Sequence, residues 1–161
     1  MKMGLLTAPF ASTPLEEVAD WSAAEGFEML EVCAWPKGEG VARRYGGVTH
    51  IDVADFTTAA AQDVAALCDK HGVAISGLGY YPNPLHPDPE HRAEVIGHLK
   101  RVIVAAELMD VPLVNTFMGD DRRLNLDENW ARAAATFPDI VAHARDAGVT
   151  LAVENCPMLF S

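Results

Sequence analysis

The sequence lacks a long hydrophobic run, and this absence excludes a protein with a membrane-spanning helix. None of its apolar stretches approaches the ~18 residues of a membrane-spanning helix, although half of its 161 residues are hydrophobic. The first nine residues hold one charge and too short an apolar core for a secretory signal peptide. We therefore expect a cytoplasmic protein without a membrane partner.

Cysteine is also scarce. The three cysteines, Cys33, Cys68 and Cys156, are widely spaced and form no CxxC pair. This number and spacing argue against a zinc knuckle or a disulfide framework, and they fit a reducing compartment.

Basic residues are few for the number of acids. Twelve Lys and Arg stand against 23 Asp and Glu, which gives a net charge of −11. Such a field repels a phosphate backbone, and the bases occur as short pairs such as Arg122–Arg123 rather than as a stripe. We therefore expect no nucleic-acid partner.

What the sequence does contain is a recurring unit: an apolar helix face, usually a Gly, and then a β-rich run of about six residues. The runs with strand character are residues 3–8, 27–33, 73–78, 113–117 and a last one around Leu151–Val153. The helical patterns run from Thr13 to about Glu25, from Phe56 to His71, from Asp88 through Ala106, and from Asn125 to Gly148.

Capping residues and apolar stripes support these helices. The predicted caps are Thr13 with Pro14, Asp88 with Pro89, and Asn125 with Glu128. The third helix carries a wide apolar stripe at spacings of three and four, made of Val95, Ile96, Leu99, Val102, Ile103 and Ala106.

Strict alternation of strand and helix predicts an α/β fold with about five parallel strands, four helices and right-handed crossovers. No linker interrupts it, so we expect a single domain over residues 1–161. Two architectures satisfy the pattern, an open doubly wound sheet and part of a (β/α)₈ barrel. A whole barrel needs about 250 residues, so this chain would supply five of its eight strands.

Polar residues stand where the predicted strands end, the edge at which parallel sheets bind ligands. Glu154 and Asn155 follow the last strand, Asn115 lies near the end of the fourth strand with the aromatic Phe117 two residues after it, and Glu31 lies near the end of the second. Glu31 is either paired or functional inside the sheet, or solvated at its rim. Asn115 satisfies either neighbouring side chains or a ligand.

Aromatic and polar residues also occupy two loops after strands. Trp35 either packs in the core or forms the apolar wall of a pocket. The loop after the third strand supplies Tyr80, Asn83 and His86 as candidate pocket residues. Asp88, Glu90 and His91 are better explained as the start of a helix than as metal ligands.

Two further patterns are set aside. Gly77-Leu-Gly79 imitates a dinucleotide fingerprint, but a Pro replaces the third Gly and no helix opens there. The remaining histidines are not expected to be ligands. His71, His98 and His143 fall on predicted helices, where solvated or capping roles are usual, and His50 falls in a long Gly-rich connection over residues 34–55.

Together, these motifs resemble the xylose isomerase-like TIM-barrel superfamily, in particular its sugar phosphate isomerase/epimerase branch. The segments that carry the resemblance are Glu31-Val-Cys-Ala-Trp35, Gly79-Tyr-Tyr-Pro-Asn-Pro-Leu85, Asn115-Thr-Phe-Met-Gly119 and Leu151-Ala-Val-Glu154-Asn155. The Glu-Asn pair at the end of strand five is the most specific of them. The resemblance implies a partial (β/α)₈ barrel, truncated after strand five.

The resemblance also implies a chemistry. Glu154 would bind a divalent metal (Mn²⁺, Mg²⁺, Co²⁺ or Zn²⁺) and could also move a proton, with the remaining ligands on later strands. The metal would polarise the carbonyl and hydroxyl oxygens of a sugar, sugar phosphate or polyol, so that isomerisation or epimerisation proceeds through an enediolate. The residues implied to bind substrate are Glu31, Trp35, Tyr80, Asn83, His86, Asn115, Phe117 and Asn155.

Two alternatives remain at this level. One is an endonuclease IV-like, metal-dependent phosphodiesterase; the other is a non-catalytic half-barrel. One carboxylate is too few for a hard cation, so we expect the 161-residue chain alone to bind metal weakly and to be inactive. Its open sheet edges predict a homo-oligomer or a complementing C-terminal half.

Overall fold

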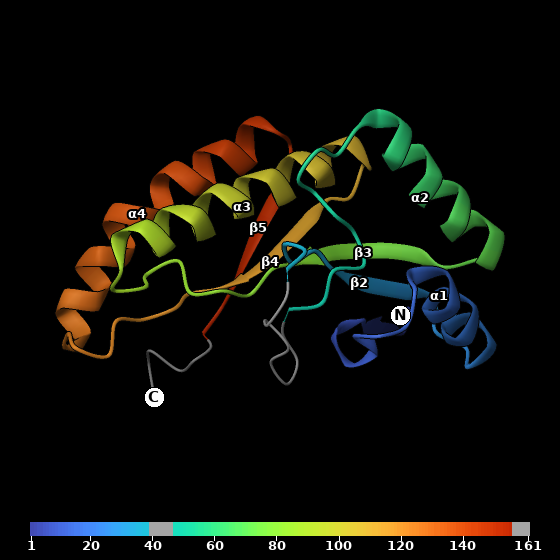
Figure 1. Cartoon of the computed structure of the whole chain (residues 1–161), viewed down its shortest axis with the longest axis horizontal. Helices are drawn as coiled ribbons and strands as arrows, with labels where there is room; N and C mark the ends of the chain where they lie inside the picture. The colour runs from blue at the N-terminus through green and yellow to red at the C-terminus, as the bar shows by residue number, and fades with distance from the viewer. Residues whose placement is uncertain (39–46, 156–161) are drawn as a thin grey trace.

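The computed structural model describes residues 1–38 and 47–155, and these residues form a curved parallel sheet with helices on its convex side (Figure 1). The strands are β1 (Gly4–Leu6), β2 (Met29–Cys33), β3 (Ala74–Gly79), β4 (Leu113–Phe117) and β5 (Thr150–Glu154). The helices are the 3₁₀ turn η1 (Ala8–Phe10), α1 (Leu15–Ala24), α2 (Thr58–His71), α3 (Pro89–Leu108) and α4 (Leu126–Asp146).

The order of the strands decides between the two architectures left open by the sequence. All pairs are parallel, and the sheet runs β1-β2-β3-β4-β5 without a reversal. A doubly wound sheet requires such a reversal. Consecutive helices also contact one another, α1 with α2, α2 with α3 and α3 with α4. The described residues therefore form part of a (β/α)₈ barrel.

The hydrophobic core lies between the sheet and the helices. Leu30, Val32, Leu78 and Val114 point from the strands into this layer and are fully buried. The stripe predicted on α3 meets them: five of its six residues are buried and Ile96 is partly buried. Since strand residues alternate between faces, the neighbours of these core residues point to the concave side.

Two of the three predicted caps are confirmed. The Asn125 side chain accepts the Glu128 N–H, and the Glu128 side chain accepts the Asn125 N–H, which completes a capping box. The Asp88 side chain accepts from the first turn of α3. The cap at Thr13 is wrong: the first helical hydrogen bond runs from the Val18 N–H to the Pro14 carbonyl, so Pro14 is the cap residue.

The described parts of the long connection, residues 34–38 and 47–55, are packed rather than open. Ala34 pairs with Thr49 in an isolated antiparallel bridge, and Val48, Ile51 and Val53 are buried. The His50 Nε2 hydrogen is donated to backbone carbonyls, so its Nδ1 accepts from the Thr7 hydroxyl at 2.9 Å. This links the loops after β1 and β2.

The expected solvated or capping role of His98 is wrong. His98 is only 4% exposed, its Nε2 donates to the Ala34 carbonyl at 2.8 Å, and its ring lies 4.4 Å from that of Tyr80. The reason is its position on α3, three residues after Val95 and four before Val102, which places it within the buried stripe.

Candidate active site

Three strands bring polar side chains to the concave face near its carboxyl edge. The register pairs Phe117 of β4 with Glu154 of β5, which puts both at the last paired position of the two strands. A bulge in β3 shifts the pairing with β2, so that Glu31 faces Gly77 rather than Ser76. The sequence-predicted Glu31, Asn115, Phe117 and Glu154 thus share one face.

Tyr81 lies at the centre of this group and is not among the site residues predicted from the sequence. Its hydroxyl donates a short hydrogen bond to Oε1 of Glu31 and lies 3.5 Å from Oε1 of Glu154. Its ring packs 4.6 Å from the ring of Phe117. Alternation along the chain explains its orientation in the structure: Tyr80 faces the helices, so Tyr81 faces the concave side.

Two glycines in β3 clear the space for these contacts. A Cβ at Gly79 would lie 2.8 Å both from Oε1 of Glu31 and from the ring carbon Cε2 of Tyr81. A Cβ at Gly77 would lie 3.2 Å from the amide nitrogen of Asn115. The Gly-x-Gly pattern therefore has a packing role in this site.

The two carboxylates have different surroundings. Glu31 is partly buried, and burial raises its pKa; the hydrogen bond from Tyr81 lowers it, the charge of Glu154 raises it, and a hydrogen bond from Asn115 lowers it. Glu154 is exposed. The arrangement therefore offers one carboxylate held by donors inside the sheet and a second one open to solvent.

Two further titratable groups on this face, Tyr81 and Cys33, keep their protons. Burial, followed by the hydrogen bond to Glu31, raises the pKa of Tyr81 far above its ordinary value. Burial raises the pKa of the Cys33 thiol to about 11. At neutral pH Tyr81 is consequently a hydroxyl donor, and Cys33 is neither a thiolate nucleophile nor a thiolate ligand.

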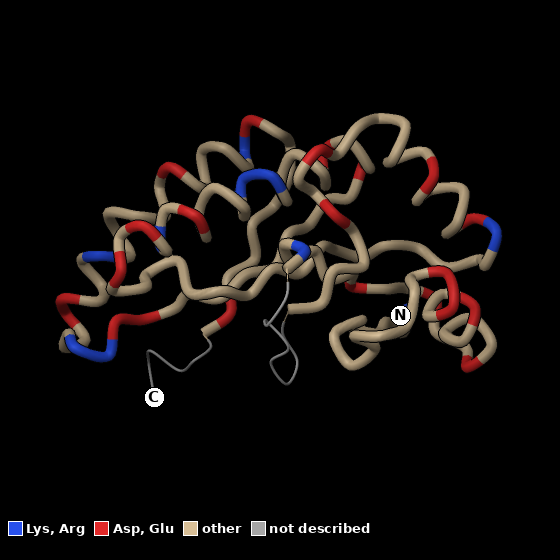
Figure 2. Tube along the Cα trace, viewed as in Figure 1, with Lys and Arg blue, Asp and Glu red and all other residues tan. Residues whose placement is uncertain are grey.

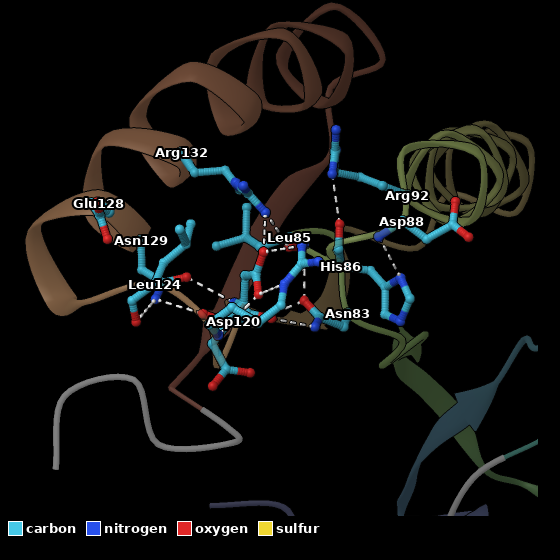
Figure 3. Close-up of polar contacts among 12 residues, drawn as sticks. Asn83, Leu85, His86, Asp88, Arg92, Asp120, Leu124, Glu128, Asn129 and Arg132 are labelled. Atoms are coloured by element: carbon cyan, nitrogen blue, oxygen red, sulfur yellow. Dashed lines mark hydrogen bonds and ion pairs between the residues drawn. The ribbon is translucent and has the colours of Figure 1, made fainter.

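Asn83 joins the loops after β3 and β4 rather than the group around Tyr81. Its Nδ2 donates to the Asp120 carbonyl at 2.6 Å, and its Oδ1 accepts from the N–H groups of Leu85 and Asp120 (Figure 3). Gly119, at φ 73°, makes this approach possible, because a Cβ there would overlap Asn83 Oδ1. These contacts satisfy backbone groups, which fixes the two loops relative to each other.

A buried ion cluster extends this connection and has no counterpart in the sequence analysis. The buried carboxylate of Asp121 accepts from Arg132 and Arg123, each at 2.8 Å, and the two arginines hold its pKa well below the usual value. Arg132 also donates to the Leu85 carbonyl, and Asn129 closes the turn through Asp121 (Figure 3). The strand-end loops are thereby attached to α4.

Other predicted site residues lie elsewhere. Tyr80 is 3% exposed and packs on the helix side, with its ring 5.5 Å from that of Trp35. Both side chains lie in the core rather than on the concave face, which for Trp35 is the packing alternative. The ring of His86 packs against that of His91, and its Nδ1 accepts the Asp88 N–H at the start of α3. Asn155 is exposed one residue beyond β5. Cys156 lies outside the described residues.

Acidic positions are spread over the helices and connections, with basic positions interspersed among them (Figure 2). Within residues 1–38 and 47–155, no helix combines the length and the apolar character needed to cross a bilayer.

The described residues contain no group of three His, Cys, Asp or Glu side chains placed to hold a metal ion. Glu154 has the right type of donor for a hard cation, but such a cation takes about six oxygen ligands. Glu31 is already engaged by Tyr81 and Asn115. The fit to a divalent metal is therefore correct in donor type and incomplete in number.

Comparison with solved structures supports the fold. D-psicose 3-epimerase from Clostridium cellulolyticum H10, solved with D-tagatose, superposes with a TM-score of 0.69 at 18% identity, over 94% of this chain and 51% of that one. The IolI protein with a bound zinc atom gives 0.69 at 14% identity, over 95% and 51%. A sugar phosphate isomerase/epimerase from Parabacteroides distasonis gives 0.63 at 17%, over 94% and 50%.

These likenesses establish the barrel fold, and the chain spans about half the length of the structures that it matches. Among curated proteins, none matches the sequence. The family model for the xylose isomerase-like TIM barrel matches residues 19–161, and the chain belongs to that family.

Proposed function

We propose that the protein is an isomerase or epimerase of a carbohydrate: a sugar, a sugar phosphate or a related polyol. The observation that carries this proposal is the pair of carboxylates, Glu31 and Glu154, on either side of the Tyr81 hydroxyl at the carboxyl edge of the sheet. Similarity to a D-psicose 3-epimerase and to a sugar phosphate isomerase/epimerase supports the substrate class.

The chemistry would be proton transfer at the carbon next to a carbonyl. Glu154 is the exposed carboxylate and would take the proton, which generates an enediolate, and return it to the same or the neighbouring carbon. The rings of Tyr81 and Phe117 would exclude water from one side of that position. Glu31, held by Tyr81 and Asn115, would position the Tyr81 hydroxyl rather than react.

A divalent metal (Mn²⁺, Mg²⁺, Co²⁺ or Zn²⁺) belongs to the same proposal. When bound, it would polarise the carbonyl and hydroxyl oxygens of the substrate. In this chain Glu154 would contribute one ligand. The remaining ligands, which would be carboxylates, imidazoles or amides, would have to come from outside the described residues.

The structure offers a surface on which such a completing segment can pack. β5 pairs with β4 along one edge, and its other edge carries no strand within the described residues. Beside it, α4 presents an apolar groove lined by Met118, Trp130, Ala133, Ala134, Phe137, Pro138 and Val141. Val141 is 48% exposed there, and Val153 of β5 is 39% exposed on the same side of the sheet.

The occupant proposed for this groove is a helix of a βα unit that continues the alternation beyond β5. Within the chain, α2, α3 and α4 each pack against the helix before them. A helix placed next to α4 would repeat that relationship, and its strand would pair with the free edge of β5. The matched structures, about twice the length of this chain, have room for such units.

The experiment is an assay of the complete protein against a panel of ketoses, aldoses and inososes with Mn²⁺, alongside the Glu154→Gln variant. We expect the wild type to interconvert at least one of these sugars and Glu154→Gln to do so about 100-fold or more slowly, because general acid–base catalysis usually contributes a factor of this size. Turnover unaffected by Glu154→Gln would contradict it. In parallel, titration of Mn²⁺ into the 161-residue chain should give weak binding that Glu154→Gln removes.

A further inference from the structure

The Tyr81 hydroxyl has two carboxylates beside it and one hydrogen to donate. The contact with Oε1 of Glu31 is the shorter, and Oε1 of Glu154 lies at 3.5 Å. A phenolic oxygen donates one hydrogen bond and accepts others. Because this hydrogen is donated to Glu31, the phenolic oxygen can only accept on the side of Glu154. The Tyr81 oxygen and the Glu154 carboxylate are therefore two neighbouring hydrogen-bond acceptors.

The surroundings hold Tyr81 in this orientation. Its ring packs on Phe117 from one side, and Gly79 leaves only enough room for the ring and the Glu31 carboxylate. Asn115 donates to Glu31 as well, which keeps that carboxylate in place as the partner of Tyr81. The acceptor side of the phenolic oxygen is therefore a fixed feature of the concave face.

Two acceptors 3.5 Å apart call for a ligand with two donors at a similar separation. Neighbouring hydroxyl groups of a polyol have this property, since each can donate one hydrogen bond while the two oxygens remain close together. A single carboxylate or phosphate does not fit, because it brings only further acceptors and negative charge against Glu154.

We propose that Tyr81 is a substrate-binding residue whose oxygen, together with the carboxylate of Glu154, accepts the two hydroxyl groups of a vicinal diol. The inference rests on the proposed function for the substrate class and adds the part of the substrate that is recognised here. It assigns the phosphate of any phosphorylated substrate to a different part of the barrel. Tyr81 thereby selects polyhydroxylated ligands by hydrogen bonding.

The test measures binding of D-sorbitol, a polyol without a carbonyl group, to the complete protein by isothermal titration. Tyr81→Phe is expected to weaken binding about 3- to 10-fold, the effect of one hydrogen bond. Tyr80→Phe is the matched control, because its hydroxyl lies on the helix side of the sheet. It should leave the affinity unchanged.

Monodeoxy-sorbitols identify the hydroxyl that Tyr81 accepts. One of them should bind the wild type as weakly as sorbitol binds Tyr81→Phe, and should lose nothing further in that variant. The inference would be overturned if every analogue lost the same affinity in the wild type and in Tyr81→Phe. It would also be overturned if Tyr81→Phe bound sorbitol as tightly as the wild type does, or if the wild type did not bind sorbitol. If Tyr81→Phe folds poorly, the wild-type series still tests the diol, because removal of either of two neighbouring hydroxyl groups should weaken binding and removal of the others should not.

Failure here is distinguishable from failure of the proposed function. A protein that binds sorbitol through Tyr81 but interconverts no sugar has the diol site without the isomerase chemistry. A protein that interconverts ketoses with the same KM in Tyr81→Phe and wild type has the chemistry without this contact.

Discussion

Gly79 lies directly against Glu31: a Cβ on Gly79 would come within 2.8 Å of Oε1 of that carboxylate. The same Cβ would meet the ring of Tyr81 at 2.8 Å. β3 is therefore built with a gap at the position where side chains from β2 and from the following loop meet. The absence of one methyl group is what permits the Tyr81–Glu31 hydrogen bond.

Gly79→Ala should displace Tyr81 and break its hydrogen bond to Glu31. Overfilling a packed position of this kind costs about 1–3 kcal/mol, and the loss is measured as the free energy of unfolding in urea. Gly97→Ala is the matched control, because a Cβ there meets only Arg101 at 3.9 Å within α3. That change should stabilise the chain by about 0.5–1 kcal/mol. Equal effects of the two substitutions would contradict the packing role of Gly79.

Local sequence signals predicted the frame of the barrel well. The bounds of β4 and the capping box at Asn125 and Glu128 are confirmed, since both depend on residues within one short segment. The stripe on α3 is confirmed for the same reason. Of the candidate site, Glu31, Asn115, Phe117 and Glu154 are brought to one face, because alternation along a strand fixes the side on which a residue lies.

The parts that escaped prediction depend on long-range contacts. Tyr80 and Tyr81 follow a strand whose register shifts at a bulge, so their sides of the sheet were not readable from a strand expected to end at Leu78. In the Asp121 cluster Arg123 is a sequence neighbour, but Arg132 comes from α4 and also reaches Leu85, 47 residues away, and no local pattern indicates that contact. Asn83 was selected for the right loop, but its amide is used by the backbone. Its role in ligand binding stays a prediction.

Gly119→Ala should be more destabilising than Gly148→Ala. Both glycines have a positive φ, 73° and 70°, so both changes carry the backbone penalty of about 1–2 kcal/mol. Only at Gly119 would the Cβ also overlap Asn83, whose Oδ1 lies 2.0 Å from the ideal position, while at Gly148 nothing lies within 4 Å. Thermal and urea unfolding of the two variants would measure the difference.

A second substitution tests the cause of that difference. In an Asn83→Ala background, most of the extra cost of Gly119→Ala over Gly148→Ala should disappear, because the overlapping side chain is gone and only Cδ of Pro84, 3.0 Å from the ideal Cβ position, remains close. If the extra loss persists in this background, the contact with Asn83 is not its source.

The stability of the chain should fall as the pH decreases from 7.5 to 5, in part because of His98. Burial lowers the pKa of His98 below 6.5; its hydrogen bond to Ala34 raises it, Arg101 lowers it further and Asp52 raises it. Below about pH 6.5 the unfolded chain therefore binds a proton that the folded chain resists, and the free energy of unfolding decreases.

His98→Gln should reduce this pH dependence, measured as the difference in unfolding free energy between pH 7.5 and pH 5.5. Some slope should remain, because burial also lowers the pKa of His50. A steeper slope in His98→Gln would reverse the sign assigned to this histidine.

Val141→Asp should distinguish a covered α4 groove from an open one. In the 161-residue chain Val141 is 48% exposed, so the substitution should change the free energy of unfolding by no more than about 0.5 kcal/mol. In a longer chain that supplies the proposed helix, that helix would bury the introduced carboxylate, at a cost of about 3 kcal/mol or more. Val104→Asp is the matched control, because Val104 is 39% exposed on α3 and does not line the groove. It should have a small effect in both proteins.

Equal tolerance of Val141→Asp in both would leave no role for a helix in this groove. Conversion of a dimer of the 161-residue chain to a monomer, seen by size-exclusion chromatography, would assign the groove to a second copy instead.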